Sequence, residues 1–227
     1  TSRTQYSNGA ATSSSIKSGT VSGVPTSVSA TPLTDSTERI TFNAPVVTGG
    51  TSILYYTVTA YLNGVATSIT ETGTASPIVV TGLTSNTGYT FVVKATNAIG
   101  DSAASSASSI AYTKIKLTPS VASVSVVTGN AMTALTFTLA SGTATTFTVS
   151  PTLPTGLSIN ASTGEITGTP AAHSTSTIYT VTASNANTSG STTFTFESTG
   201  SAPDAPRINS ITSGDGQLTV AFDAPGV

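Results

Sequence analysis

A short phrase that ends a β-strand in a turn occurs twice in this chain. The first copy is Ile40-Thr41-Phe42-Asn43-Ala44-Pro45, and the second is Leu218-Thr219-Val220-Ala221-Phe222-Asp223-Ala224-Pro225. In both copies large apolar side chains alternate with small or polar ones, which is the period of a half-buried strand. A β-module that recurs and is interrupted at both ends of the sequence predicts a segment of a longer array.

The composition favours a chain built entirely from β-strands. Charged residues make up only 7% of the sequence, against about 25% in an average soluble protein, and Thr and Ser fill the polar positions instead. Thr is β-branched and suits a pleated, half-exposed surface. Hydrophobic residues reach 37% and recur with period two, so we expect folded sandwiches rather than disorder.

The same composition excludes several classes of partner. The net charge of −2 gives no basic surface for nucleic acid or an anionic membrane. The absence of cysteine excludes a disulfide framework and thiolate metal sites. No apolar run approaches the roughly 20 residues of a membrane-spanning helix. A surface of hydroxyl groups is typical of secreted bacterial repeat proteins, so we expect an extracellular or cell-surface location, with a virion surface left open.

The stretch from Val24 to Thr113 reads as about seven short strands separated by turn signals. Residues 53–61 form a long expected strand, and Asn63-Gly64 after it is a strong hairpin signal because both positions tolerate positive φ. Residues 89–95 alternate cleanly, which directs Tyr89 to the core and Lys94 to water. Residues 105–112 are expected to form a closing strand of small residues.

This stretch resembles a fibronectin type III domain, to which we assign residues 22–113. The specific part of the resemblance is Leu83 followed by Tyr89 at the head of an alternating strand. In that family the tyrosine is a corner residue whose hydroxyl bonds back to the preceding loop. Phe42 stands where the family often has a core tryptophan, and Pro45 follows it in the usual place. The resemblance implies a spacer or recognition scaffold.

The sequence changes character over residues 114–198. Gly156-Leu157-Ser158-Ile159 runs into Thr163-Gly164-Glu165-Ile166-Thr167-Gly168-Thr169-Pro170. We expect a tight turn at residues 162–164 and the end of the hairpin at residues 168–170, which makes Gly164, Gly168 and Pro170 structural residues. This phrase resembles the bacterial "Putative Ig" module, a cadherin-like sandwich. The predicted fold class is therefore all-β, with tandem Ig-like and fibronectin type III sandwiches in an elongated array.

Partial modules are expected at both ends of the sequence. Residues 1–21 resemble residues 96–113 and are interpreted as the closing strand of a preceding type III-like module. Residues 199–227 begin with a Pro-punctuated junction and are interpreted as the first strands of a further fibronectin type III domain.

No set of residues in the sequence has the pattern of a catalytic site. His173 is the sole histidine, and a nucleophile–base pair or a zinc site would need it, but it lies in an expected loop with no acidic neighbour. The nine acidic residues are scattered, and no phosphate loop or nucleophile elbow occurs. We therefore expect no catalytic, cofactor-binding or metal-binding residues, no cofactor and no enzyme activity.

Weaker signals each have a plain structural explanation. Cadherin-like modules often bind calcium at junctions, and Asp101, Asp204 and Glu197 would be the first ligands to consider. Tyr55 and Tyr61 are candidates for exposed aromatic platforms, although ordinary cross-strand packing explains them. The glycosylation sequons at Asn160 and Asn187 are consistent with chance in so Ser/Thr-rich a chain. An intramolecular Lys94–Asn97 crosslink would need a buried pair beside a carboxylic acid, whereas Lys94 is expected to face water.

Three functions fit these observations. The first is a spacer, stalk or fibre segment of a large bacterial or phage surface protein that presents distal adhesive units. The alternatives are a carbohydrate- or protein-binding adhesin module and an accessory spacer of a secreted polysaccharide-degrading enzyme. The expected partners are neighbouring modules of the same chain, and beyond them other copies in a filament or a surface glycan or protein. Nucleic acid and membrane insertion are excluded.

Overall fold

The computed structural model describes residues 19–200 and 205–223, and within these ranges it contains strands and turns but no α-helix. The chain divides into two compact units. Unit 1 comprises Thr1–Pro32, Thr37–Gly82 and Gly88–Ala111, and unit 2 comprises Leu33–Ser36, Leu83–Thr87 and Tyr112–Val227. No helix in the described ranges is long and apolar enough to cross a membrane. The all-β class predicted from the sequence is confirmed.

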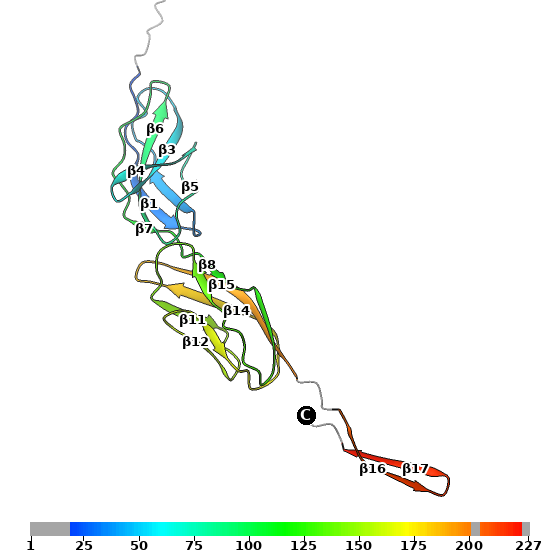
Figure 1. The fold of residues 1–227 in the computed structure, drawn as a ribbon. Helices are drawn as coiled ribbons and strands as arrows, with labels where there is room; N and C mark the ends of the chain where they lie inside the picture. The colour runs from blue at the N-terminus through cyan, green and yellow to red at the C-terminus, as the bar shows by residue number, and fades with distance from the viewer. Residues whose placement is uncertain (1–18, 201–204, 224–227) are drawn as a thin grey trace, which may run out of the picture. The chain divides into compact units, whose positions relative to one another are not determined.

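The strands of the first sandwich form two sheets (Figure 1). One sheet has the order β1 (Thr26–Pro32), β2 (Glu38–Asn43), β5 (Ile78–Val80), and the other has the order β4 (Val65–Gly73), β3 (Ile53–Leu62), β6 (Gly88–Asn97), β7 (Ala111–Tyr112). The two inner faces meet in the core, where the Phe42 and Tyr56 rings lie 4.8 Å apart. Period-two alternation produces this core, because Val58 of β3 and Val93 of β6 pair directly and are both fully buried.

The predicted hairpin at Asn63-Gly64 is confirmed. Both residues have positive φ, 51° and 79°, and Leu62 pairs with Val65 across the turn. The strand that follows, β4, runs from Val65 to Gly73 and pairs with β3.

The expected closing strand at residues 105–112 was largely wrong, since only Ala111–Tyr112 forms a strand. Instead, serines at every third position attach the segment to β6. The hydroxyl oxygens of Ser102, Ser105 and Ser108 accept hydrogen bonds from β6 backbone N–H groups at 2.9–3.0 Å. The backbone N–H groups of the same serines donate to β6 carbonyls at 2.8–3.0 Å. A three-residue spacing is that of an extended left-handed helix rather than a pleated strand.

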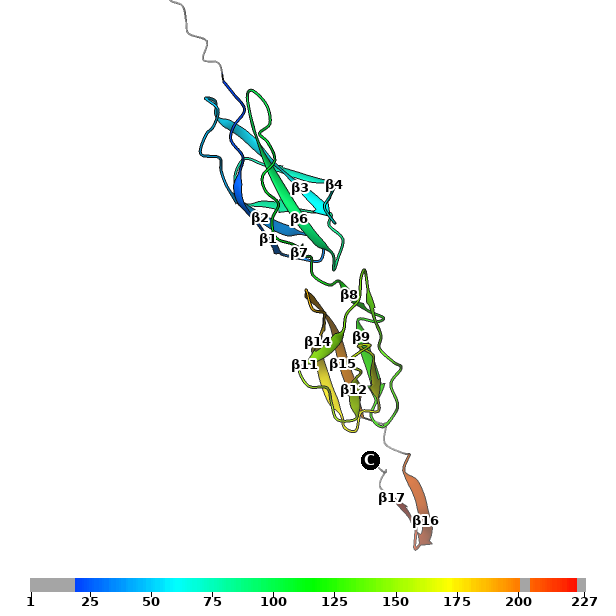
Figure 2. The same cartoon turned by 90° about the vertical axis from the view of Figure 1, so that its left-hand side faces the viewer.

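The second sandwich has a four-stranded sheet as its largest layer (Figure 2). Its order is β11 (Thr146–Ser150), β14 (Ser174–Ser184), β15 (Ser189–Thr199), β9 (Ser123–Val127). Two strand pairs accompany it, β8 (Leu117–Pro119) with β10 (Phe137–Leu139) and β12 (Leu157–Ile159) with β13 (Ile166–Gly168). Tyr179 of β14 stacks on Phe194 of β15 with ring centroids 5.5 Å apart. β9 runs parallel to β15, unlike the other strand pairs of the described chain.

The predicted turn at residues 162–164 is present between β12 and β13. Ile159 pairs with Ile166, and the Gly164 N–H donates to the Asn160 carbonyl at 2.8 Å. Gly164 has φ +77°, and a Cβ on it would lie 2.6 Å from the Phe147 ring. Glycine is required here for two reasons, the left-handed backbone and the buried ring beside it.

The chain ends found in the sequence are described only in part. The expected closing strand of a preceding module lies mostly in residues 1–18, which are outside the described residues. Gly19–Val21 are in no strand. Near the other end, β16 (Arg207–Gly214) and β17 (Gln217–Asp223) form an antiparallel pair.

Replacing Gly164 with Ala should destabilise unit 2 by about 2 kcal/mol or more, because it adds a left-handed Ala to a clash with Phe147. Gly129 is the matched control, since it has φ +84° but no atom within 4 Å of its would-be Cβ. Gly129→Ala should cost only the backbone share, about 1 kcal/mol. Urea unfolding followed by circular dichroism measures both, and equal losses would contradict the role of the Phe147 contact.

Candidate functional site

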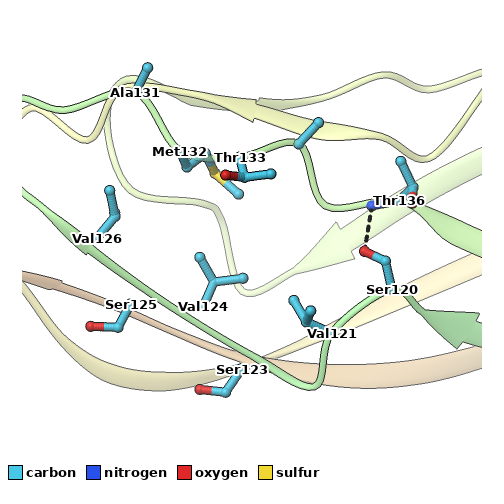
Figure 3. Close-up of a pocket in the computed structure, with 11 residues that line it drawn as sticks. Ser120, Val121, Ser123, Val124, Ser125, Val126, Ala131, Met132, Thr133 and Thr136 are labelled. Atoms are coloured by element: carbon cyan, nitrogen blue, oxygen red, sulfur yellow. Dashed lines mark hydrogen bonds between the residues drawn. The ribbon is translucent and has the colours of Figure 1, made fainter.

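A groove of about 600 Å³ lies beside β9 in unit 2 (Figure 3). Val124 of β9 and Met132 lie on opposite sides of it, and the Thr136 N–H donates to Ser120 Oγ at 3.2 Å. β9 is the last strand of its sheet. The 11 lining residues carry methyl, thioether and hydroxyl groups and no ionisable group. The groove therefore contains no acid, base or activated nucleophile.

Sequence reasoning did not find this groove. Its walls come from residues 120–126 and 131–136, which read as an ordinary strand and connection. The parallel pairing of β9 with β15, beside which the groove lies, joins residues far apart in the sequence. No residue type in the sequence marks that pairing.

His173 lies in the loop before β14, as predicted. Its Nδ1 lies 2.5 Å from the Ser198 backbone carbonyl oxygen, to which a protonated Nδ1 donates. The Ser198 hydroxyl in turn donates to the Ala172 carbonyl at 2.9 Å. The histidine therefore holds this loop against β15, and among the described residues no hydrogen bond joins its ring to a carboxylate.

Two of the three possible calcium ligands lie within the described residues. The Asp101 carboxylate accepts a hydrogen bond from the Thr96 hydroxyl at 2.8 Å, and Glu197 lies within β15. Asp204 lies outside the described residues. Over residues 19–200 and 205–223, no group of three or more His, Cys, Asp or Glu side chains could hold a metal ion.

The remaining candidates occupy ordinary surface or packing positions. Tyr55 is 40% exposed whereas Tyr56 is 5% exposed, as alternation along β3 predicts. Lys94 is exposed, while the buried Asn97 amide donates to two backbone carbonyls in its own unit, at 2.8 and 2.9 Å. Both sequon asparagines, Asn160 and Asn187, are exposed.

The residues singled out for the type III resemblance are buried. Phe42, Leu83 and Tyr89 are 6%, 4% and 2% exposed, and the Tyr89 and Phe91 rings lie 6.3 Å apart. In the Ig-like phrase, Gly168 has φ +130° and Pro170 is buried. The corner hydrogen bond of the Tyr89 hydroxyl stays a prediction.

One buried ionisable group was missed at the sequence level. Glu38 is 0% exposed, and neither of its carboxylate oxygens has a hydrogen-bond partner. A signal was available, because Glu38 is in phase with Ile40 and Phe42 on the inward face of β2. Burial raises the pKa of the Glu38 carboxyl from 4.5 to about 7, with no contribution from a neighbouring charge.

Unit 1 should lose stability as the pH rises from 4.5 to about 7. Below pH 4.5 the Glu38 carboxyl is protonated in both the folded and unfolded states, so the folded state pays no cost of burying a charge. Between these values the unfolded chain ionises while the folded core must stay protonated, and above about 7 the loss is complete. The total loss should be on the order of 3 kcal/mol.

Glu38→Leu should abolish this dependence and raise the free energy of unfolding at pH 8, as measured by urea unfolding at pH 4 and pH 8. The control is Glu71→Gln, since the Glu71 carboxylate is partly exposed and accepts a hydrogen bond from the Thr81 hydroxyl. That variant should keep the pH dependence. If wild-type unit 1 is equally stable at both pH values, the carboxyl is not held unpaired in the core.

Tyr89→Phe should lower the free energy of unfolding of unit 1 by about 1–2 kcal/mol, because it removes a buried hydroxyl bond. Tyr55→Phe is the control, since Tyr55 is 40% exposed and water can solvate its hydroxyl. Thermal unfolding followed by calorimetry measures both. An unaltered midpoint for Tyr89→Phe would refute the corner role.

Two family models match this chain. The fibronectin type III domain model matches residues 23–111, and the model described as "Putative Ig domain" matches residues 118–199. Residues 200–227 fall in neither match. The two matches confirm the resemblances found in the sequence, in the same order along the chain.

Solved structures with similar folds come from several animal proteins. The FN1-FN3 domains of chicken CNTN1 are 17% identical with a TM-score of 0.38, covering 89% of this chain and 75% of that one. Domains A168-A170 from titin are 24% identical with a TM-score of 0.40, covering 42% of this chain and 33% of that one. The FN5 domain of Drosophila Lar is 27% identical with a TM-score of 0.34, covering 41% of this chain and 97% of that one.

The chain therefore spans a third of the titin structure's length. No curated protein matches it.

Proposed function

Because this chain belongs to the fibronectin type III and "Putative Ig" domain families, which it carries in tandem, we propose that it is a structural spacer segment of an extracellular protein. Domains of these types are typical of extracellular proteins, and they are generally non-catalytic. In this function the chain separates and presents other parts of its parent protein, such as a distal adhesive unit on a bacterial or phage surface. Its partners are the neighbouring modules of the same chain.

The observation that carries the proposal is that each unit buries a core of its own. In unit 1 this core is built on β3 and β6, and in unit 2 it is built on β14 and β15. Val93 and Val181 are each fully buried at the centre of one of these cores. A module with its own core can fold and bear load without its neighbour.

The low content of charged residues supports the same function. At 7% charged residues, the surface exerts little long-range attraction on polyions. The proposal includes no enzyme activity of the segment's own, in line with the generally non-catalytic nature of these domain types.

Independent folding can be tested with two matched core substitutions. Val93→Ala should lower the stability of unit 1 alone, and Val181→Ala that of unit 2 alone, each by about 2 kcal/mol because each leaves a small cavity. Calorimetry should show two transitions of which one moves in each variant. Single-molecule pulling should likewise show two separate unfolding events. A single transition, or a shift of both by either substitution, would contradict independent modules.

A further inference from the structure

The β16–β17 hairpin has one face made almost entirely of large apolar side chains. Across the pair, Ile208 lies opposite Phe222 and Ile211 lies opposite Val220, and Leu218 shares the face by alternation along β17. These side chains are 39–66% exposed. The other face carries hydroxyl groups, at Ser210, Thr212 and Thr219. An isolated hairpin with an uncovered apolar face is marginally stable in water.

This hairpin repeats the pairing of β1 and β2, including its irregularity. In unit 1, Thr26 pairs with Asn43 and Ser29 with Thr41, so that β1 has one extra residue. In the second hairpin, Arg207 pairs with Asp223 and Ser210 with Ala221, so that β16 has one extra residue at the same place. A bulge at one register position fixes the alignment of all the residues beyond it.

The shared register matches the three apolar residues of β17 with buried residues of β2. Ile40 corresponds to Val220, and Phe42 corresponds to Phe222. In unit 1 these positions are 0% and 6% exposed, because the β4-β3-β6-β7 sheet and β5 cover them. In the second hairpin the same positions are 39% and 64% exposed. The difference between the hairpins is the cover and not the pairing.

We propose that the apolar face of β16–β17 is the docking surface for a set of strands equivalent to β3–β7, which completes a second fibronectin type III sandwich. The strands that fit it present an uncharged face of alternating apolar residues, as Tyr56, Val58 and Ala60 do in β3. The occupant is a set of strands of the type III kind, with the sequence features of residues 46–113. Ala224-Pro225 repeats Ala44-Pro45, and the latter leads into the loop before β3.

The inward-facing residues of β16–β17 differ from those of β1–β2 at two positions that change the chemistry of the core. Leu218 occupies the position of Glu38, and Ile211 that of Ala30. The β16–β17 hairpin therefore carries an apolar side chain at the position where unit 1 has an unpaired carboxyl. This proposal rests on the proposed function, since it adds one module to the array.

The test extends the full chain after Pro225 with a second copy of its own residues 46–113. A third cooperative unfolding transition should appear, and the β17 amides should exchange with solvent roughly 100-fold or more slowly than in the 227-residue chain. A second version carries Ile211→Ala, Leu218→Glu and Val220→Ile, which give these positions the residues of unit 1. In this version a failure to dock cannot be caused by poor packing between the hairpin and the added strands. Unprotected β17 amides in both versions would overturn the proposal.

Two point variants of the extended chain locate the surface. Phe222→Asp should abolish the added protection, because it places a charge in the new core. Thr219→Asp is the matched control, since Thr219 corresponds to the exposed Arg39, and it should leave the protection in place. Equal effects of the two variants would overturn the proposal.

Two further readouts separate this proposal from its alternatives. Protection of β17 in the unextended chain that grows with protein concentration would show that a second copy covers the face, and would overturn the proposal in favour of dimerisation. The transitions of units 1 and 2 are read separately in the same scans, so a failure of the docking surface is distinguishable from a failure of independent folding.

Discussion

Both units depend on one constraint, which is that every second residue along a strand points inward and is buried in the core. The chain has no cysteine, and each sandwich is held mainly by apolar packing and by hydrogen bonds of backbone and side-chain groups. The contacts at the centre are few and large, such as Phe42 on Tyr56 in unit 1 and Tyr179 on Phe194 in unit 2. Contacts of this kind combine apolar burial with a preferred ring geometry.

Hydroxyl groups make many of the polar side-chain contacts that charged groups make in other proteins. A single salt bridge is present in the described chain, between Lys116 and Asp35 at 3.5 Å, and surface pairs of this kind contribute little. The closing segment of unit 1 instead uses the hydroxyls of Ser102, Ser105 and Ser108 to accept bonds from β6. A segment of small residues can thus close a sandwich although it has few apolar side chains to bury.

Glu38 is the exception to the apolar core. Two carboxylate oxygens without partners are costly in a place that the surrounding packing would give to an apolar residue. The β16–β17 hairpin places Leu218 in the equivalent register position. The difference makes the charge state of one residue a determinant of the stability of unit 1, while the second hairpin lacks this dependence.

The sequence by itself determined the features that depend on local chemistry. Alternation identified the inward faces of β3 and β6, Asn63-Gly64 identified a hairpin through its positive φ, and the phrase around Gly164 identified the β12–β13 turn. Most features that depend on strands far apart in the sequence were decided only by the tertiary structure. Examples are the parallel pairing of β9 with β15, the groove beside β9, and the attachment of residues 102–108 by serine hydroxyls. For Glu38, the sequence alone determined only that the side chain faces inward, through its phase along β2. That its carboxylate oxygens find no hydrogen-bond partner depends on the tertiary structure. Local pattern specifies which way a side chain points, but what it meets there depends on residues that only folding brings together.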